Sequence, residues 1–225
     1  MRPLEWEGSV NARDLGGLRT GDGCVIRSGA VVRSGMLDRL TPRGWSELMA
    51  YGIRTIVDLR NDEERSVVPP PPLTCVHVPL DDVADTAMWE LIKAGDLDGT
   101  PLYYPIFLER KVERCVAAVR AVAQAGPGGV LVHCGGGRDR TGLVSMLLLL
   151  LAGVPPEEII ADYELSNRHM ALNAPRFCTL HVLARHGTTE REALLAVLDS
   201  FDAAAYLRDG GLRDDEIRAV RSRLC

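Results

Sequence analysis

The sequence predicts an α/β fold of three layers, in which a central, mostly parallel sheet is flanked by helices. Short apolar segments alternate with stretches of helical periodicity, which is typical of a parallel sheet with helices on both faces. A strand, a glycine-rich turn and a helix follow one another directly at residues 130–142. The 225 residues, 46% hydrophobic and 25% charged, are enough for one domain with a substantial core.

The first half of the chain contains several strand candidates and one well-marked helix. The helix begins at Thr41, where a capping threonine precedes a first-turn proline, Pro42. Four prolines at 69–72 predict an extended connector, because proline fixes φ and lacks a backbone donor. The apolar segments that predict strands are residues 25–26, 30–32, 54–59 and 75–80.

The second half is predicted to be mainly helical around one strand at 130–132. Residues 81–104 are irregular, with a helix around 87–94, and we interpret them as an insertion at the functional site. From about residue 171 the chain is expected to form a helical C-terminal part of a single domain, 1–225. The helical stretches are residues 105–124, 141–152, 156–165, 189–201 and 214–223.

The turn between the strand at 130–132 and the next helix predicts an anion site. Cys134 follows the strand, three glycines occupy 135–137, and Arg140 stands six positions after the cysteine. Backbone N–H groups of such a turn point inward and make a cradle for a tetrahedral dianion. The guanidinium of Arg140 can donate to two oxygens of that anion at once.

The same turn makes Cys134 a candidate nucleophile. A free thiol is mostly protonated at neutral pH, but a helix N-terminus and a nearby guanidinium both favour the thiolate. Thr141, in the first helical turn, is expected to cap the helix and to donate its hydroxyl to the sulfur. We interpret His133 as a hydrogen-bonded neighbour that tunes the thiolate.

Composition argues against several classes of function. The net charge of −5 gives no general attraction for nucleic acid or an acidic membrane surface. The longest apolar stretch, residues 143–152, is too short to cross a bilayer, so we expect no membrane insertion. The N-terminal residues lack the apolar core of a secretory signal, which predicts a cytoplasmic protein.

Six cysteines are scattered along the chain without a Cys-x-x-Cys pair or a histidine-rich spacing. The sequence therefore predicts neither a metal site nor a cofactor. Apart from Cys134, the cysteines are expected to be small buried side chains or surface thiols. These are Cys24, Cys75, Cys115, Cys178 and Cys225.

Residues 133–142 (HCGGGRDRTG) resemble the His-Cys-x5-Arg-Thr/Ser-Gly signature of the cysteine-dependent phosphatases. The ending Arg-Asp-Arg-Thr-Gly is similar to a bacterial branch of these tyrosine and dual-specificity enzymes. Further segments resemble that branch, in order, over roughly residues 9–170. They are residues 11–17 (NARDLGG), 27–29 and 33–35 (RSG), 40–42 (LTP), 55–60 (TIVDLR) and 153–163. The resemblance implies a phosphotyrosine-phosphatase-like fold.

The chemistry of the turn predicts metal-independent hydrolysis of phosphomonoesters through a cysteinyl-phosphate on Cys134. The resemblance implies phosphotyrosine in proteins as the substrate, with phosphoserine, phosphothreonine or phosphoinositides as further ones. Two alternatives stay open. One is a phosphatase for a small metabolite such as a sugar or nucleoside phosphate, and the other is a module that binds phosphate without turnover.

The leaving oxygen needs a proton, and the sequence leaves several carboxylic acids as its source. Asp139, inside the turn, is the first choice, although it could instead be a structural partner of Arg138 or Arg13. Asp58, at the end of a central strand, is the second choice, with the alternative role of orienting an arginine. Asp81 or Asp82, at the next strand end, is the third.

Two further arginines are candidate substrate contacts. Arg138 stands where the bacterial branch commonly has lysine, and it either binds a second anionic group or is a solvated surface charge. Arg13 either contacts substrate or, with Asp14, braces the turn. The predicted binding residues are Gly135, Gly136, Gly137, Arg138, Thr141 and Arg13.

Overall fold

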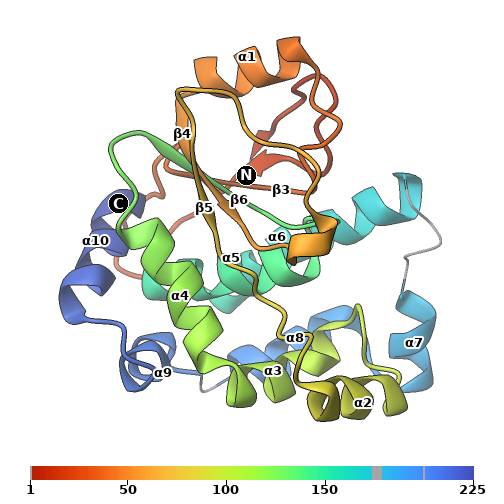
Figure 1. The fold of residues 1–225 in the computed structure, drawn as a ribbon. Coiled ribbons are helices and arrows are strands. Elements are labelled where there is room, and N and C mark those ends of the chain that lie inside the picture. Colours follow the sequence, from red (N-terminus) through yellow and green to blue (C-terminus); the bar gives the residue numbers. More distant parts are fainter. Residues whose placement is uncertain (1, 174–178, 200) are drawn as a thin grey trace.

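In the computed structural model, which describes residues 2–173, 179–199 and 201–225, one mixed sheet has the strand order β1-β2-β3-β6-β4-β5 (Figure 1). Strands β3, β6, β4 and β5 run parallel, and β1 and β2 add an antiparallel edge. This confirms the predicted central, mostly parallel sheet. The strands are β1 (Arg2–Pro3), β2 (Arg13–Asp14), β3 (Val31–Ser34), β4 (Ile53–Asp58), β5 (Thr74–His77) and β6 (Gly129–His133).

Helices cover both faces of this sheet (Figure 1). Helix α1 (Pro42–Ala50) packs against β4 on one face, and α4 (Val112–Ala123) and α5 (Asp139–Leu151) lie on the other. No helix in the described part of the chain is long and apolar enough to span a bilayer. The other helices are η1 (Asp62–Glu64), α2 (Thr86–Ala94), η2 (Pro101–Tyr103), α3 (Tyr104–Arg110), α6 (Pro156–Asn173), α7 (Leu180–Arg185), α8 (Glu190–Leu198), α9 (Ala203–Asp209) and α10 (Asp214–Leu224).

Strand β6 is buried on both sides, as expected for the centre of a parallel sheet. Successive side chains of a strand point to opposite faces. Val130 and Val132 accordingly belong to the apolar cluster that contains α4 and α5, whereas Leu131 belongs to the cluster that contains Leu48 of α1. The residue that follows this strand is therefore held by two packed layers.

Two predicted elements differ in the structure. Residues 25–26 are not a strand, because Val25 makes only an isolated bridge to Arg19. The helix expected over 105–124 is divided into α3 and α4 at Lys111, which leaves helical backbone angles where its ammonium group reaches Asp82 and Asp85. The start at Thr41 is confirmed, since its hydroxyl accepts the Gly44 N–H at 3.2 Å.

Cys24 and Cys225 form a disulfide that joins the loop before β3 to the end of α10. The prediction of free side chains is therefore wrong for these two. They are separated by 201 residues, and only the fold brings them together. Cys75 is an exposed thiol, Cys115 and Cys134 are buried thiols, and Cys178 lies outside the described residues.

The carboxyl ends of the parallel strands meet at one edge of the sheet. Ser34 of β3 and Asp58 of β4 both lie opposite His133, the last residue of β6. Ligand sites of parallel α/β sheets form at this edge. The loops that follow these strands therefore build one site around Cys134.

Candidate active site

The cysteine loop, residues 134–138, joins the carboxyl end of β6 to the first turn of α5. Cys134 is 3% exposed, and its Sγ accepts a hydrogen bond from the Gly137 N–H at 3.3 Å. The first N–H groups of a helix have no partners within the helix, and they carry the positive end of its dipole. The cysteine loop and the start of α5 together favour a bound anion next to the sulfur.

Only glycine fits at position 137. Its φ is +68°, and a Cβ there would lie 2.4 Å from the Gly35 backbone N and 2.6 Å from the Ser34 carbonyl carbon. The same two segments are also hydrogen-bonded, because the Met36 N–H donates to the Gly135 carbonyl at 2.8 Å. The residues after β3 thus support the cysteine loop directly.

Side chains from the first part of the chain hold the carbonyl groups of the cysteine loop. Asn11 Nδ2 donates to the carbonyls of Gly136 and Gly137 at 3.2 and 3.1 Å. Arg33 Nη2 donates to the Gly137 carbonyl at 2.9 Å. These bonds fix the orientation of the peptides, so that the Gly137 N–H is directed to Cys134.

A buried ionic cluster lies behind these contacts. Arg13 Nε lies 2.8 Å from Oδ1 of Asp162 in α6, and Arg33 pairs with the other oxygen of the same carboxylate. Burial and then the charge of Arg33 lower the pKa of Arg13 to about 10. Burial alone would raise the pKa of Asp162, but the two arginines outweigh it and lower that pKa below its ordinary value.

Arg13 does not lie where a substrate contact is expected. Its side chain is 4% exposed, and it donates to Asp162, Ser166 and Asn11. Because Asn11 in turn holds the carbonyls of the cysteine loop, Arg13 acts as a brace behind that loop. The sequence offered a bracing role for Arg13 together with Asp14, but the Asp14 carboxylate accepts hydrogen bonds from Gly16, Gly29 and Tyr51 and not from the cysteine loop.

The guanidinium of Arg140 is held between two carboxylates. Glu64 of η1 accepts two hydrogen bonds from it, of which the Nη2–Oε1 bond is 2.7 Å long. Asp81 Oδ2 lies 3.3 Å from Nη1 on the same guanidinium. Burial lowers the pKa of Arg140, but Glu64 and the charge of Cys134 raise it by more, so the group stays charged beside the sulfur. The bond to Arg140 likewise lowers the pKa of Glu64.

Asp81 has the properties of a proton donor. It follows β5, its side chain is 15% exposed, and it faces Arg140. Burial raises the pKa of Asp81 from 3.8 to about 6, against the opposing charge of Arg140 and with the help of Glu64 and Asp139. A carboxyl group with a pKa near 6 keeps part of its protons near neutral pH, and general acid catalysis requires such a protonated group.

Asp58 and Asp82 are each engaged in ion pairs. Both oxygens of Asp58 accept hydrogen bonds of 3.0 Å from Arg60, and its side chain is 3% exposed. Burial raises the pKa of Asp58, but the bond from Arg60 and the nearby His133 lower it by more. Asp82 Oδ2 lies 3.0 Å from Lys111 Nζ, and this bond is the main cause of its lowered pKa. Asp58 thus takes the arginine-orienting position that the sequence offered as its alternative.

Asp139 is the first residue of α5, and one oxygen of its carboxylate is hydrogen-bonded. Its Oδ1 accepts hydrogen bonds of 3.1 Å from both Arg138 Nε and the Tyr163 hydroxyl. Its backbone carbonyl accepts a third from the Tyr104 hydroxyl at 2.8 Å. The predicted structural alternative, a pair with Arg138, is therefore present.

Arg138 and Thr141 are placed differently from the prediction. The Arg138 side chain is 3% exposed, and it donates to Asp139, to the Gly99 carbonyl and to the Thr179 hydroxyl. It ties the cysteine loop to the segment before η2 instead of reaching toward solvent. Thr141 is the third residue of α5, and its hydroxyl donates to the Ser34 carbonyl at 3.4 Å instead of to the sulfur.

His133 is a neutral neighbour of the cysteine. Burial lowers its pKa from 6.5 to about 4, and this outweighs the opposing charge of Asp58. Its Nδ1 lies 3.3 Å from the Cys134 carbonyl oxygen, and its Nε2 lies 3.5 Å from Asp58 Oδ1. His133 therefore positions the backbone at Cys134 and carries no charge at neutral pH.

Four residues of the site were not singled out in the sequence for these roles: Asn11, Arg33, Glu64 and Asp162. Asn11, Arg33 and Asp162 lie inside three of the segments that resemble the bacterial branch, so the signal for them was present. Glu64 lies outside these segments and had no distinctive spacing. In residues 2–173, 179–199 and 201–225 no three His, Cys, Asp or Glu side chains are grouped so that they could hold a metal ion.

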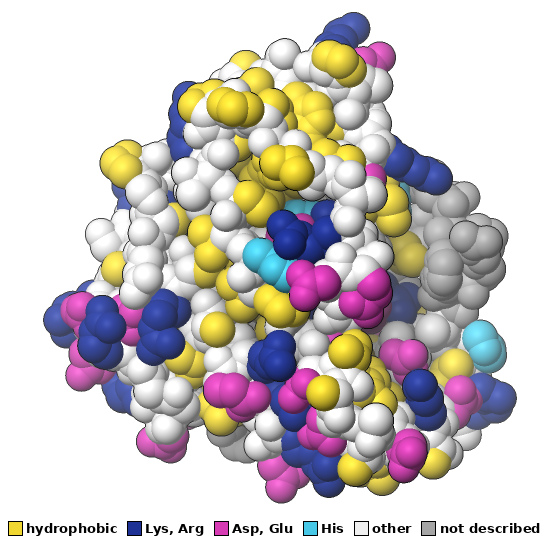
Figure 2. All heavy atoms as spheres, viewed as in Figure 1, with side chains coloured by type: hydrophobic (Ala, Val, Ile, Leu, Met, Phe, Trp, Pro, Cys, Tyr) yellow, Lys and Arg dark blue, Asp and Glu magenta, His cyan; other side chains and the backbone are white. Residues whose placement is uncertain are grey.

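The surface beside Arg140 carries both signs of charge. Figure 2 shows basic, histidine and acidic side chains gathered near the middle of this face, where η1 and β5 lie in Figure 1. Asp62 of η1 forms an ion pair with Arg65, and its Oδ1 lies 3.7 Å from Nδ1 of His77 in β5. The recognition of an anion thus depends on the cysteine loop and Arg140 more than on a broad basic surface.

Comparisons with known proteins agree with this site. The chain matches the tyrosine phosphatase family over residues 4–225. It is 28% identical over 231 residues to a tyrosine-protein phosphatase of Nostoc commune. This alignment covers 89% of this chain and 76% of that protein. It is 30% identical over 198 residues to the triple specificity protein phosphatase PtpB of Mycobacterium tuberculosis, covering 74% of this chain and 70% of the relative.

Among solved structures, TpbA of P. aeruginosa in complex with pTyr gives a TM-score of 0.41 at 15% identity, covering 81% of this chain and 86% of that one. The family match spans nearly the whole sequence and includes the cysteine loop, Arg140 and the segments that brace them. The chain therefore belongs to the tyrosine phosphatase family and is a phosphatase.

Proposed function

We propose that this phosphatase hydrolyses phosphomonoesters through a cysteinyl-phosphate on Cys134, without a metal ion. The observation that carries the proposal is the placement of the Cys134 sulfur, 3.3 Å from the Gly137 N–H in the cysteine loop, with charged Arg140 in the first turn of α5. Loop amides, helix dipole and guanidinium supply the positive potential that a phosphoryl group needs during transfer.

In the first step the Cys134 thiolate attacks phosphorus, forming an S–P bond while the ester P–O bond breaks. The oxygen of the leaving group takes a proton from the Asp81 carboxyl group. We assign Asp81 this role because it faces Arg140 and its pKa lies near 6. Asp81 follows β5, and its contact with Arg140 places it near the group that holds the phosphoryl oxygens.

In the second step water attacks the phosphorus of the cysteinyl-phosphate. The Asp81 carboxylate, left without its proton by the first step, takes a proton from that water. The S–P bond breaks, the thiolate is regenerated and inorganic phosphate leaves. Arg140 holds the phosphoryl oxygens through both steps with those of its five N–H donors that Glu64 does not use.

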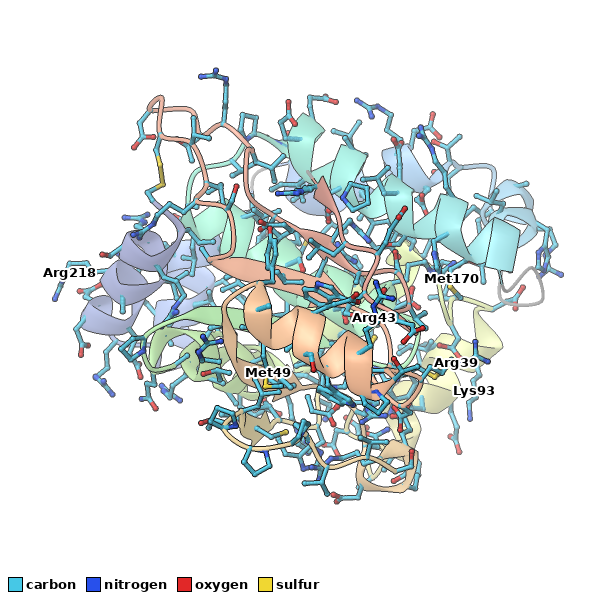
Figure 3. All side chains as sticks on the ribbon, turned by 90° about the horizontal axis from the view of Figure 1, so that it is seen from above. Arg39, Arg43, Met49, Lys93, Met170 and Arg218 are labelled. Atoms are coloured by element: carbon cyan, nitrogen blue, oxygen red, sulfur yellow. A yellow bond between two sulfur atoms is a disulfide. The ribbon has the colours of Figure 1, made fainter. Side chains whose placement is uncertain are left out.

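The proposed substrate is phosphotyrosine in proteins, with phosphoserine, phosphothreonine and phosphoinositides as further substrates. The family match and the name of the Mycobacterium tuberculosis relative support this range. The cysteine loop adds support, because Gly135 and Gly136 project no side chains into the pocket and a Cβ at Gly136 would be 3.7 Å from Met170 of α6 (Figure 3). The thioether of Met170 beside Gly136 offers an apolar contact for the aromatic ring of a phosphotyrosine.

We also propose that residues 1–225 act as a single catalytic domain. In this domain, residues 81–104 form an insertion at the active site that contributes the acid. The helical C-terminal part, from about residue 171, belongs to the same domain. The contacts of Arg138 with Gly99 and Thr179 support this assignment, because they connect the cysteine loop to both segments.

The central test is a rapid-quench experiment with an aryl phosphate in the presence of a chelator. We expect turnover under these conditions and a phosphoryl group on the peptide that contains Cys134, detected by mass spectrometry. Cys134→Ser should abolish turnover and still bind a phosphotyrosine peptide. Activity that survives in Cys134→Ser, or that requires added Mg²⁺, would overturn the mechanism.

A substrate panel tests the specificity separately. Phosphopeptides, phosphoinositides and sugar or nucleoside phosphates are compared by kcat/KM. We expect phosphotyrosine peptides to exceed the metabolites by at least about tenfold, which corresponds to about 1.4 kcal/mol of transition-state binding. The reverse order would favour the metabolite phosphatase.

A further inference from the structure

We propose that the cavity between α10 and the amino ends of β3 and β6 is a second anion site, which binds the phosphate group of a small ligand through Arg27 and Arg223. The cavity is open and has a volume of about 550 Å³. Its lining residues are Arg27, Ser28, Gly29, Ala30, Ala123, Gly128, Gly129, Ala219, Ser222 and Arg223.

The cavity is separate from the catalytic site. Ala30 precedes β3 and Gly129 begins β6, whereas Cys134 follows the carboxyl end of β6. The two sites therefore lie at opposite edges of the sheet. In Figure 1 the C-terminus, after α10, lies beside the connection that leads into β6.

Two guanidinium groups line this cavity without a carboxylate partner. Arg27 Nη2 donates to the carbonyls of Ser222 and Arg223, and the second of these bonds is 3.0 Å long. Arg223 donates to the carbonyls of Ala125, Gly126 and Gly128. Within the described ranges neither arginine forms an ion pair, so the two positive charges are balanced only by carbonyl dipoles.

Several donors remain for a ligand. Arg27 is exposed, and its Nε and Nη1 make no hydrogen bond with any described residue. Arg223 Nε also lacks a hydrogen-bond partner, but it has almost no exposed surface, so a ligand reaches it only after the side chain moves. Burial and the charge of Arg27 also lower the pKa of Arg223, as expected for two cations that share a site.

The donor set indicates a phosphate-like dianion. Two arginines match two negative charges, their planar forks match pairs of oxygens, and the hydroxyls of Ser28 and Ser222 line the same cavity. The Cys24–Cys225 disulfide lies next to both arginine-bearing segments and fixes them to each other. A preformed site of this kind loses little entropy on binding.

Inorganic phosphate is the probe, and the readout is the set of arginine Nε–Hε signals in nuclear magnetic resonance spectra of the full chain. We expect the Arg27 and Arg223 signals to shift together and to saturate with one dissociation constant, equally in wild type and in Arg140→Met. Arg27→Gln and Arg223→Gln should each weaken this binding at least about tenfold. Arg27 is exposed, so its variant keeps the test decisive if Arg223→Gln folds poorly.

Arg218→Gln is the matched control. It removes one positive charge from the exposed side of α10, the helix that carries Arg223 (Figure 3). It should leave phosphate binding unchanged. Signals of Arg27 and Arg223 that stay fixed while the cysteine loop saturates would overturn the proposal. So would shifts that chloride at equal ionic strength reproduces.

A vesicle arm distinguishes the source of the phosphate group. Phosphatidylcholine vesicles with and without phosphatidic acid are sedimented with the protein. Binding only to the acidic vesicles, lost in Arg27→Gln, would assign the site to a lipid headgroup. Phosphate binding without vesicle binding would assign it to a soluble phosphorylated ligand.

Discussion

Asp81 and Glu64 contact the same guanidinium, yet their surroundings give them different protonation. Glu64 accepts two hydrogen bonds from Arg140, and these lower its pKa. Asp81 makes a single longer contact of 3.3 Å, and burial raises its pKa to about 6. One carboxylate therefore orients the arginine while the other can carry a proton, a separation that acid catalysis commonly uses.

The role of Asp81 predicts a specific pH dependence. Because its pKa is raised to about 6, the group is protonated below that pH and loses its proton above it. We expect kcat/KM for an alkyl phosphate to fall above about pH 6 in wild type. Asp81→Asn should lower that kcat/KM by about 10²–10⁴-fold and remove the fall.

The same variant should lose much less activity toward para-nitrophenyl phosphate, whose leaving group needs little protonation. Asp139→Asn is the competing variant, since Asp139 was the first choice from the sequence. If Asp139→Asn, and not Asp81→Asn, shows the selective loss with poor leaving groups, the assignment of the acid is wrong.

Asp162 is expected to contribute strongly to stability, because its removal leaves Arg13 and Arg33 buried together. Asp162→Asn should lower the free energy of unfolding by about 3–5 kcal/mol, measured by urea denaturation. Asp96→Asn, which breaks an exposed ion pair with Arg185, should have little effect. Equal effects of the two variants would contradict the bracing role.

The contribution of Asp162 should also be visible in the pH dependence of the free energy of unfolding. The pKa of Asp162 is lower in the folded protein than in the unfolded chain. Its contribution is therefore present above the unfolded pKa and is lost as the pH falls through the folded pKa. The difference in stability between wild type and Asp162→Asn should shrink in acid.

At the scale of elements, contacts with Lys111 and Trp89 hold the segment between β5 and α2 in place. Lys111 Nζ lies 3.0 Å from Asp82 Oδ2 and 2.7 Å from Asp85 Oδ2. The indole of Trp89 in α2 donates to the Asp82 carbonyl at 2.8 Å. These contacts fix the residue that follows Asp81, and so they fix the direction of the acid.

Lys111→Met should therefore lower kcat for an alkyl phosphate by about tenfold or more, because a small displacement of a catalytic group is costly. Lys111→Arg should restore most of this loss. The readout that separates positioning from general destabilisation is the pH profile, where Lys111→Met should shift or flatten the fall assigned to Asp81. A variant that lowers stability but keeps the wild-type profile would contradict the positioning role.

At the scale of the whole molecule, the disulfide joins two segments that are far apart in sequence. Figure 3 shows the bond between α10 and the loop that contains Cys24. Closing 201 residues of chain restricts the unfolded state, so we expect Cys24→Ser to lower the free energy of unfolding by roughly 2–5 kcal/mol.

Because the bridge lies away from the cysteine loop, kcat of the folded Cys24→Ser protein should equal that of wild type. Reduction of the wild-type bridge should give the same loss of stability. A bridge that persists is typical of oxidising compartments, so the predicted cytoplasmic location is best tested by measuring the redox state of Cys24 in cells. Unchanged stability after reduction would show that the bridge contributes nothing.

The sequence by itself determined the catalytic strand, the cysteine loop and the helix after it, because each depends on residues that are neighbours in the chain. Cys134, the glycines and Arg140 lie within seven positions, and local geometry brings them together. Apolar segments likewise predicted β4, β6 and α5, and the Thr41–Pro42 start predicted α1. The helix break at Lys111 was missed because its cause lies in Asp82 and Asp85, on another element.

Only the tertiary structure decided which carboxylates face Arg140 and which are engaged elsewhere. Asp58, Asp81 and Asp139 are alike as residue types, and their protonation depends on burial and on partners from other elements. The inward position of Arg138 and the Cys24–Cys225 bridge also depend on contacts between distant segments. Local sequence fixes backbone conformation, whereas electric environment and solvent access are properties of the assembled fold, and for that reason the proposal of Asp81 among the candidate acids rests on the structure.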